Sequence, residues 1–461
     1  MIFFFSLAFI SLSFQGFSQS GSRGKKLTIS RDHPQYFEFG GEPLLLLGGS
    51  DNDNLFQSGN VKEQLDHLKA AGGNYVRCTM SSRDEGDEWS FHLNKETDKY
   101  DLTQWNEVYW NRFHNFLKLT AEREIIVQIE VWATFDFYRS NWLKNPFNPE
   151  NNQNYTVERT KLPTEVPSHP TRTNNAFFRT IPSSPETNFV VLGYQQKFVD
   201  KLLSYTLQYG HILYCIDNET SVSSEWGKFW AGYIKTRAKE ETTQPVLVTE
   251  MWDPWDLDHI AHRQSFDHPE IYDFVEISQN NHKKGQEHWD NGRRQIERLK
   301  KRGFLRPVTN VKIYGANQGK HGGDDNDAIE KFVRNVLFGA ASARFHRPTS
   351  GIGVSEKARA VIRSLRMATD SIDFFRARPF HEPLSNRDDN EAYAIGNSGG
   401  EMIVYFPGKG QVNLEIPQKK FQIHWLDVNK AAWQKPKVVR GKDLSLKNPF
   451  ERHGIAIIKP V

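Results

Sequence analysis

The most constraining feature of this chain is a repeated alternation of short apolar segments and helix-like segments between residues 44 and 348. The segment 212–216 is apolar throughout and ends in Asp217, Asn218 and Glu219, as a buried parallel strand does where it opens onto a site. Strand segments of this kind can be placed at 44–47, 74–80, 124–132, 212–216, 246–250, 274–279, 307–314 and 343–348. Eight apolar strands separated by helices predict an α/β fold and favour a closed (β/α)₈ TIM barrel.

A different pattern begins near residue 383. Short strands then follow one another at intervals marked by turn residues, with almost no helix between them. This pattern is typical of a small antiparallel β-sandwich. We therefore expect a signal peptide at 1–18, a barrel at 27–382 and a C-terminal sandwich at 383–461.

Two connections of the predicted barrel stand out. Before the first barrel strand, the segment 27–49 reads as a hairpin with Gly40 and Gly41 at its turn. The segment 139–190 is rich in Asn, Pro and Thr, carries little periodicity, and follows the carboxyl end of a strand. We expect it to be a long loop over the top of the barrel that shapes the binding site.

The N-terminus and the composition narrow the possible environments and ligands. The first 20 residues are apolar and end in small residues, which predicts an exported protein, secreted or periplasmic, and the run is too short for a membrane span. The 59 basic and 56 acidic residues leave a net charge of +3, so nothing indicates nucleic acid as a partner. Cys78 and Cys215 lie in predicted core strands and read as buried thiols.

No cofactor motif is present. The sequence has no glycine-rich phosphate loop after a strand, no HExxH and no Cys/His cluster, so neither a dinucleotide nor a metal is expected.

Polar and aromatic residues stand at nearly every predicted strand end. They are Asp51, Asp53, Arg77, Glu130, Trp132, Asp217, Asn218, Glu219, Glu250, Trp252, Asp253, Glu276, Gln279, His282, Asn310, Lys312, Tyr314, His346 and Arg347. Each has an ordinary structural explanation when taken alone. Because the carboxyl ends of barrel strands converge on one rim, and because unpaired buried charges cost several kcal/mol each, the set as a whole predicts a binding site.

The acidic residues of this rim suit glycoside cleavage, which needs two carboxyl groups, one to donate a proton and one to act as nucleophile or as base for water. Aromatic side chains are natural platforms for sugar rings. Trp132, Trp226 and Trp252 are the candidates for that role.

The motifs together resemble the clan A glycoside hydrolases, most nearly the secreted apiosidase-like barrels with a C-terminal β-domain. The resemblance is carried by LLLLGGSDND, the Asn218-Glu219 pair, QNNH, PVTN and FVRNVLFGAASARFHRP. It implies a retaining glycosidase in which Glu219 is the general acid/base, with a raised pKa, and in which Asn218 holds a sugar hydroxyl. The expected polysaccharide or oligosaccharide is its only partner.

One departure from that family affects the second carboxylate. Where the family has its nucleophilic glutamate, near the end of strand seven, this chain has Lys312. We expect Glu250 or Glu276 to take that role, with Asp253 next. Alternatively, a neighbouring group of the substrate attacks while Lys312 binds an anion, or the chain is a non-catalytic carbohydrate-binding protein, or, less favoured, it is a polysaccharide lyase.

Basic residues at the rim raise a further hypothesis. Lys312, Arg77, His282 and Arg347 could make the cavity cationic, which would favour a substrate that carries carboxylate or sulfate. The alternative is that these cations only neutralise the neighbouring acids.

Overall fold

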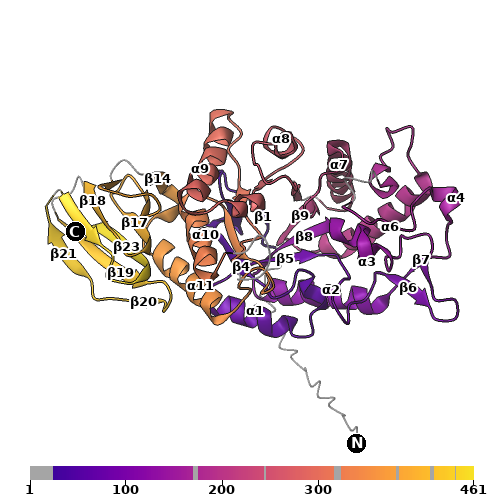
Figure 1. The fold of residues 1–461 in the computed structure, drawn as a ribbon, viewed down its shortest axis with the longest axis horizontal. Helices are drawn as coiled ribbons and strands as arrows, with labels where there is room; N and C mark the ends of the chain where they lie inside the picture. The colour runs from indigo at the N-terminus through magenta and orange to yellow at the C-terminus, as the bar shows by residue number, and fades with distance from the viewer. Residues whose placement is uncertain are drawn as a thin grey trace, which may run out of the picture.

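The computed structural model describes residues 24–169, 175–242, 245–315, 323–380, 384–415, 420–441 and 443–461. The molecule is elongated, with an α/β part at its centre and the C-terminal strands, drawn in yellow, at one end (Figure 1). The predicted signal peptide at 1–18 lies outside the described residues.

Eight short parallel strands form the centre of the α/β part. They are β4 (Leu46–Gly49), β5 (Tyr75–Thr79), β8 (Ile126–Trp132), β9 (Ile212–Asp217), β10 (Leu247–Thr249), β11 (Val275–Glu276), β12 (Val308–Thr309) and β13 (Ser342–Phe345). Six of them make one sheet in the order β10-β9-β8-β5-β4-β13, and β11 pairs with β12. The strands therefore follow one another around a ring in chain order, as the alternation of the sequence predicts.

The ring is not closed by continuous strand ladders. β10 and β11 are joined by a bond from Asp273 N to Val248 O of 2.8 Å, and β12 and β13 by a bond from Ala341 N to Val308 O of 2.7 Å. β11 and β12 are much shorter than the predicted strands at 274–279 and 307–314, because the chain turns after Glu276 into the 3₁₀-helix η4 (Ser278–His282). The predicted closure of the barrel is thus not found: the eight strands follow one another in ring order, but strand pairing is interrupted between β10 and β11 and between β12 and β13.

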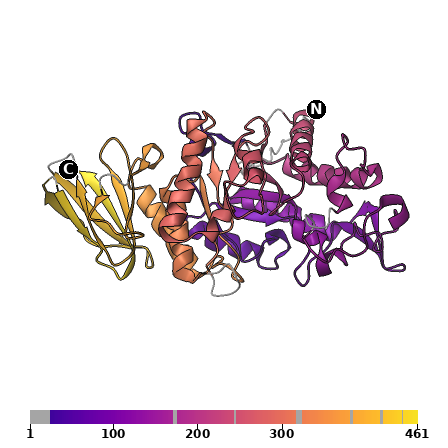
Figure 2. The same ribbon diagram turned by 45° about the horizontal axis from the view of Figure 1, so that its top comes forward.

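Amphipathic helices surround the strands (Figure 2). They are α1 (Val61–Ala70), α2 (Glu107–Glu122), α6 (Phe189–Thr206), α7 (Ser224–Glu241), α8 (Ile260–Phe266), α9 (Gly285–Lys301), α10 (Asp325–Leu337) and α11 (Glu356–Thr369). In α7, the buried Trp226, Trp230 and Ile234 recur every four residues, the spacing that places side chains on one helix face. The burial of such faces builds one large core with the strands.

The N-terminal residues form a small antiparallel sheet of β1 (Leu27–Ile29), β2 (Phe37–Phe39) and β3 (Glu42–Leu44). Gly40 and Gly41 connect β2 to β3 with φ values of 65° and 90°. Glycine adopts such values without strain, so the predicted hairpin turn is confirmed.

The long insertions have more structure than the sequence suggests. The polar segment after β5 contains the hairpin of β6 (Phe91–Asn94) and β7 (Lys99–Trp105). The predicted loop at 139–190 contains the short helices α3 (Arg139–Trp142), α4 (Val157–Thr160) and η3 (Ala176–Arg179). Asparagine amides hold its turns by bonding the backbone, as Asn148 does with Trp142 O at 3.1 Å, a substitute for regular secondary structure. The remaining short 3₁₀-helices are η1 (Leu55–Gln57), η2 (Thr134–Phe137) and η5 (Phe374–Arg376).

The C-terminal part consists of two antiparallel sheets packed face to face. The larger holds β14 (Arg378–Phe380), β16 (Tyr393–Gly396), β17 (Met402–Gly408), β19 (Lys420–Asp427), β20 (Ala432–Trp433), β21 (Lys437–Arg440) and β23 (Arg452–Pro460), and the smaller holds β15 (Leu384–Ser385), β18 (Gln411–Glu415) and β22 (Asp443–Lys447). β14 precedes the expected boundary at residue 383.

The larger sheet buries both of its faces. Along β17, Val404 belongs to the core between the two sheets, whereas Tyr405 belongs to the core shared with the α/β part. This alternation follows from the two-residue period of a strand. Ser364 of α11 also donates a hydrogen bond to Val428 O at 3.0 Å, so the sandwich is packed directly on the helices.

Candidate active site

Glu219 occupies an unusual backbone conformation directly after β9. Its φ is 56°, in the left-handed region that costs a residue with a Cβ roughly 1–3 kcal/mol. The flanking residues are held by backbone bonds, from Asn218 N to Trp132 O at 3.0 Å and from Thr220 N to Met251 O at 2.8 Å. Such conformations persist where the surrounding structure enforces them, and they are concentrated at functional sites.

Three side chains from later strand ends surround the Glu219 carboxylate. Lys312 Nζ lies 2.9 Å from Glu219 Oε1, and the hydroxyl of Tyr314 and Nε2 of Gln279 each donate to the same oxygen at 3.4 Å. The Glu219 side chain is 31% exposed. The structure thus brings together four residues that the sequence places on three separate strands.

This surrounding keeps Glu219 ionised. Burial by itself raises the pKa of Glu219, but the ion pair with Lys312, together with the charges of Arg77 and His346, outweighs burial and lowers the pKa to about 2. The expectation of a raised pKa at Glu219 is therefore wrong, because burial, although the largest single influence, is outweighed by Lys312 together with Arg77 and His346.

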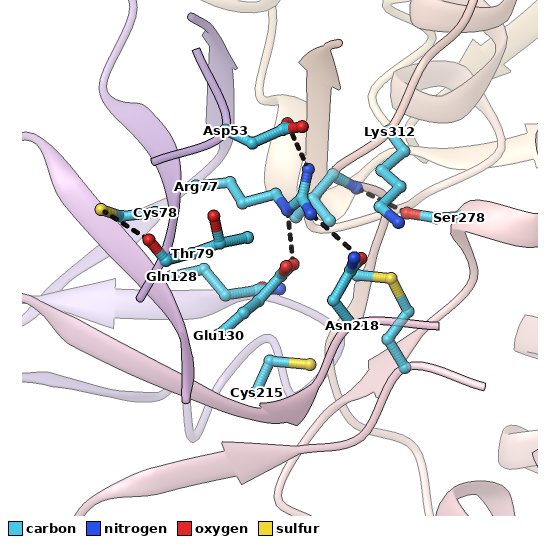
Figure 3. A network of polar contacts seen from close by, with 12 residues as sticks. Asp53, Arg77, Cys78, Thr79, Gln128, Glu130, Cys215, Asn218, Ser278 and Lys312 are labelled. Atoms are coloured by element: carbon cyan, nitrogen blue, oxygen red, sulfur yellow. Dashed lines mark hydrogen bonds and ion pairs between the residues drawn. The ribbon is translucent and has the colours of Figure 1, made fainter. Parts of the chain in front are cut away.

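Arg77 of β5 connects Glu219's neighbour Asn218 to two buried acids (Figure 3). Its guanidinium bonds Asp53 Oδ1 and Glu130 Oε1 at 2.6 Å each and donates to Asn218 Oδ1 at 3.0 Å. All four side chains are nearly or completely buried. A planar guanidinium with three fixed partners is a rigid support, so Arg77 orients Asn218 beside Glu219.

Asp53 is shared by several cations. Besides Arg77, it contacts Arg83, Arg347 Nε at 3.2 Å and His346 Nε2 at 3.3 Å. Burial raises the pKa of Asp53, but these neighbours, Arg77 foremost, lower it well below its usual value. Asp53 is therefore a buried anion that holds several arginine side chains together.

Glu250 and Glu276, the first choices for the second carboxylate, bond the backbone of their own and of neighbouring strand ends. Glu250 Oε1 accepts from the backbone N–H of Asp217 at 2.9 Å and of Met251 at 3.0 Å. Glu276 accepts from the backbone N–H of Ser278 at 2.7 Å and of Val311 at 3.1 Å. Burial raises the pKa of both, that of Glu276 to about 7, and both side chains are almost completely shielded from solvent.

Asp253 lies next to Glu219 at the end of β10. Its backbone N–H donates to Thr220 O at 2.8 Å, so residues 251–253 and 218–221 run side by side. Burial, and then the negative charge of Glu219, raise the pKa of Asp253, while His169 and Lys312 oppose the rise. Asp253 is half-buried. Glu219 and Asp253 thus form a pair of carboxyl groups in which Glu219 has a lowered pKa and Asp253 a raised pKa.

The remaining predicted residues divide into two groups. His282 bonds Gln279 Oε1 through Nε2 at 3.0 Å, and the ring of His346 lies 5.0 Å from that of Tyr314, so both belong to the surroundings of Glu219. Asp51 instead accepts from Val354 N at 2.9 Å and ties two loops together. Asp217 and Asn310 bond neighbouring backbone or amide groups.

The tryptophans expected to stack on sugars lie in the core instead. Trp132, Trp226 and Trp252 are at most 2% exposed. Trp132 packs among other aromatic rings, including Trp230 at 5.3 Å, and Trp252 Nε1 donates to Ser265 Oγ at 2.9 Å. Trp226 belongs to α7, and residues of α6, α7 and α8 pack around Trp132 and Trp252.

Trp255 is a site residue that the sequence analysis missed. Its side chain is 51% exposed, and its ring stacks on the imidazole of His282 with centroids 4.1 Å apart and an angle of 16°. Through His282 and Gln279 it is linked to Glu219. The signal was the segment Asp253-Pro254-Trp255, since a proline after the acid forces the chain out of the strand and places the next residue on a loop.

Neither a metal centre nor a membrane segment occurs in the part of the chain that the structure describes. No group of three or more His, Cys, Asp or Glu side chains could hold a metal ion there. Over the same residues, no helix is long and apolar enough to cross a bilayer.

Comparison with solved structures finds the same fold in glycoside hydrolases. A glycoside hydrolase family 5 protein from Bacteroides vulgatus ATCC 8482 matches with a TM-score of 0.66 at 13% identity, over 94% of this chain and 93% of that chain. A second structure, described as a glycoside hydrolase, matches with a TM-score of 0.64 at 12% identity, over 94% and 97% of the two chains. No family model and no curated protein matches the sequence. The shared fold agrees with the clan A resemblance of the motifs.

Proposed function

We propose that this protein is a glycoside hydrolase that cleaves a polysaccharide or oligosaccharide. The observation that carries the proposal is Glu219, whose left-handed backbone holds a partly exposed carboxylate among Lys312, Tyr314 and Gln279. A backbone strained in this way at a strand end is costly to maintain, and such strain is concentrated at functional sites. The fold shared with glycoside hydrolases supports a sugar as the substrate.

Asp253 is proposed as the proton donor and Glu219 as its ionised partner. Glycosidases separate these roles by giving two carboxyl groups different pKa values. Asp253 has the raised pKa and therefore keeps its proton at higher pH, whereas Lys312 keeps Glu219 ionised. Asp253 thus protonates the leaving oxygen, and Glu219 acts as nucleophile or as base for water. This assignment reverses the role expected for Glu219 from the family resemblance.

Glu250 and Glu276 are proposed to support the site from within the barrel. Each accepts hydrogen bonds from backbone N–H groups of the strand-end turns. Removing either carboxylate would leave such groups without acceptors. Their proposed contribution is to hold the turns that carry the reacting groups.

A second candidate, a non-catalytic carbohydrate-binding protein, is favoured by the ion pair itself. Lys312 occupies the place where the resembling family has a nucleophile, and it neutralises Glu219 at 2.9 Å. A binding protein would use the same polar set to hold a sugar without cleaving it. The two candidates differ in the role of the Glu219 carboxylate, which a hydrolase needs for cleavage and a binding protein would use only to hold the sugar.

The test is turnover and binding by Glu219→Gln on a panel of polysaccharides. We expect the variant to lose about 10²- to 10⁴-fold in kcat, as for removal of one acid–base group, while its Kd for the best substrate stays within severalfold. Glu225→Gln on the exposed side of α7 is the matched control and should leave kcat unchanged. A protein that binds a glycan but releases no reducing ends, with or without the substitution, would instead be the binding protein.

We also propose that the chain is exported, on the basis of its apolar first 20 residues. Expression of the full gene with N-terminal sequencing of the extracellular or periplasmic protein tests this. Cleavage close to residue 18 is expected, and retention of the intact N-terminus in the cytoplasm would contradict it.

A further inference from the structure

Two arginines stand beside the candidate active site without full charge compensation. Arg83 follows β5 and Arg347 follows β13, and both reach the same oxygen of Asp53, Oδ2. Their side chains are 15% and 24% exposed. We refer to Arg83 and Arg347 as the arginine pair.

Asp53 cannot neutralise all of its partners. This single carboxylate also pairs with Arg77, which has Glu130 as a second acid. Among the described residues, Arg83 makes no second ion pair, and its guanidinium carbon instead lies 3.9 Å from the centre of the Phe135 ring. Asp53 and Glu130 thus supply two negative charges for the three positive charges of Arg77, Arg83 and Arg347.

The second acid near Arg347 compensates it only weakly. Arg347 Nη1 lies 3.5 Å from Asp84 Oδ1, and the Asp84 side chain is 36% exposed, so solvent screens this pair. In addition, the buried Nε atom of Arg83 has no hydrogen-bond acceptor among the described residues, and that of Arg347 faces Asp53 Oδ2 at 3.2 Å without forming a hydrogen bond. Buried guanidinium donors normally have hydrogen-bond acceptors. The arginine pair therefore lacks hydrogen-bond acceptors for its Nε atoms as well as full charge compensation.

Two further acids, Asp136 and Asp87, face this region. Burial raises the pKa of Asp136 to about 8, so Asp136 is mostly protonated at neutral pH. Asp87 accepts from the backbone N–H of Arg83 at 2.9 Å rather than from its guanidinium.

Shared neighbours link the arginine pair to Glu219. Arg347 follows His346, whose ring lies 5.0 Å from that of Tyr314, and Tyr314 donates to Glu219. Arg83 shares Asp53 with Arg77, which bonds Asn218 next to Glu219. A sugar held at Glu219 would therefore have neighbouring substituents within reach of the pair.

We infer that the arginine pair, converging on Asp53 beside Glu219, binds a carboxylate or sulfate group of the glycan substrate. Of the four cations that first suggested an acidic substrate, Lys312 and Arg77 are paired with Glu219, Asp53 and Glu130, so the inference keeps Arg347 of that set and adds Arg83. It deepens the proposed hydrolase function, on which it depends, by naming the chemical class of the substrate. Guanidinium groups bind both anions well because their planar donors match the oxygens of either group.

The test compares chemically matched glycans. The best substrate from a panel of neutral, uronate-bearing and sulfated polysaccharides is assayed beside its carboxyl-reduced or desulfated form. We expect loss of the anionic group to lower kcat/KM at least about tenfold, mainly through KM, as for loss of a charge-assisted hydrogen bond. If carboxyl reduction lowers kcat/KM, the bound group is a carboxylate. If desulfation lowers it, the bound group is a sulfate.

Variants of the arginine pair provide the second measurement. Arg83→Gln and Arg347→Gln should raise KM for the acidic glycan by a much larger factor than KM for its neutral form. Arg237→Gln on α7 removes an arginine that also pairs with two acids, Asp200 and Glu240, and should affect neither. A neutral best substrate, or equal losses on both forms, would overturn the inference.

The anion site can be tested even if the hydrolase proposal fails. If no glycan is cleaved, affinity electrophoresis of the same panel still decides whether acidic glycans bind. Retardation by acidic but not by neutral glycans, lost in Arg83→Gln, would support the anion site, and equal migration on all of them would contradict it.

Discussion

At the scale of single residues, the account depends on how Lys312 sets the charge of Glu219. Because the folded pKa of Glu219 is about 2, below its ordinary value of 4.5, the ion pair stabilises the fold at neutral pH. This contribution is fully present above about pH 4.5 and is lost as the pH falls towards 2. The same pairing keeps Glu219 ready to act as an anion across the whole neutral range.

Lys312→Met should therefore move the acidic limb of activity to higher pH. Without the lysine, burial is the dominant influence on Glu219, so its pKa rises and the carboxylate is protonated at a higher pH than in the wild type. The measurement is kcat/KM between pH 3 and pH 8.

Lys228→Met is the control for this change, because Lys228 pairs with Glu225 on the surface of α7. It should keep the wild-type profile. An acidic limb that stays in place in Lys312→Met would show that Lys312 does not govern the ionisation of Glu219.

At the scale of elements, α7 packs closely against the end of β10. A Cβ at Gly227 would lie 2.6 Å from Glu250 Oε2 and 2.8 Å from the Tyr272 hydroxyl. Glycine at this position lets the helix approach the strand end that carries Glu250. In contrast, a Cβ at Gly232 of the same helix would have no atom within 4 Å.

The two glycines should respond to alanine with opposite signs. Gly227→Ala is expected to lower the free energy of unfolding by about 1–3 kcal/mol, because a buried carboxylate or tyrosine must move. Gly232→Ala is expected to raise it by about 0.5–1 kcal/mol, because alanine favours the helix. Urea unfolding of both variants checks this, and effects of the same sign would contradict the close packing of α7.

The sequence predicted these elements better than it predicted the site. The ring of strands and the position of Glu219 follow from local patterns, since apolar runs ending in polar residues are visible in the chain itself. The partner of Glu219 is not visible in this way. Glu250 and Asp253 are three residues apart, and only the tertiary structure shows that Glu250 bonds backbone N–H groups while Asp253 lies beside residues 218–221.

Tryptophan roles were unpredictable for a related reason. Trp252 and Trp255 are equally plausible platforms in the sequence, but one is 2% exposed and the other 51% exposed. Their difference depends on which residues cover each ring, such as Ser265 of α8 over Trp252. The covering of Trp252 is set by the whole fold and leaves no local signal, whereas Pro254 marks the loop position of Trp255.

At the scale of the whole molecule, the sandwich and the α/β part share one core. Tyr405, Leu426 and Ile455 of the larger sheet are fully buried against the α/β part. The shared burial couples the two parts, because neither can unfold without exposing apolar surface of the other. We expect a single unfolding transition in calorimetry.

Leu426→Ala tests this coupling. Removal of a buried leucine side chain should cost about 2–5 kcal/mol and lower the temperature of the one transition. The exposed Val438, also in the larger sheet, supplies the control Val438→Ala. Two separate transitions, of which only one responds to Leu426→Ala, would contradict a shared core.

The central claim is that Glu219 and Asp253 divide the acid–base work of glycoside cleavage. The most direct measurement is kcat/KM against pH for the wild type and for Asp253→Asn. We predict a bell-shaped profile for the wild type, and for the variant a rate lower by about 10²- to 10⁴-fold without the descending limb on the basic side, because the proton donor is gone. A variant with the wild-type rate and profile would contradict the claim.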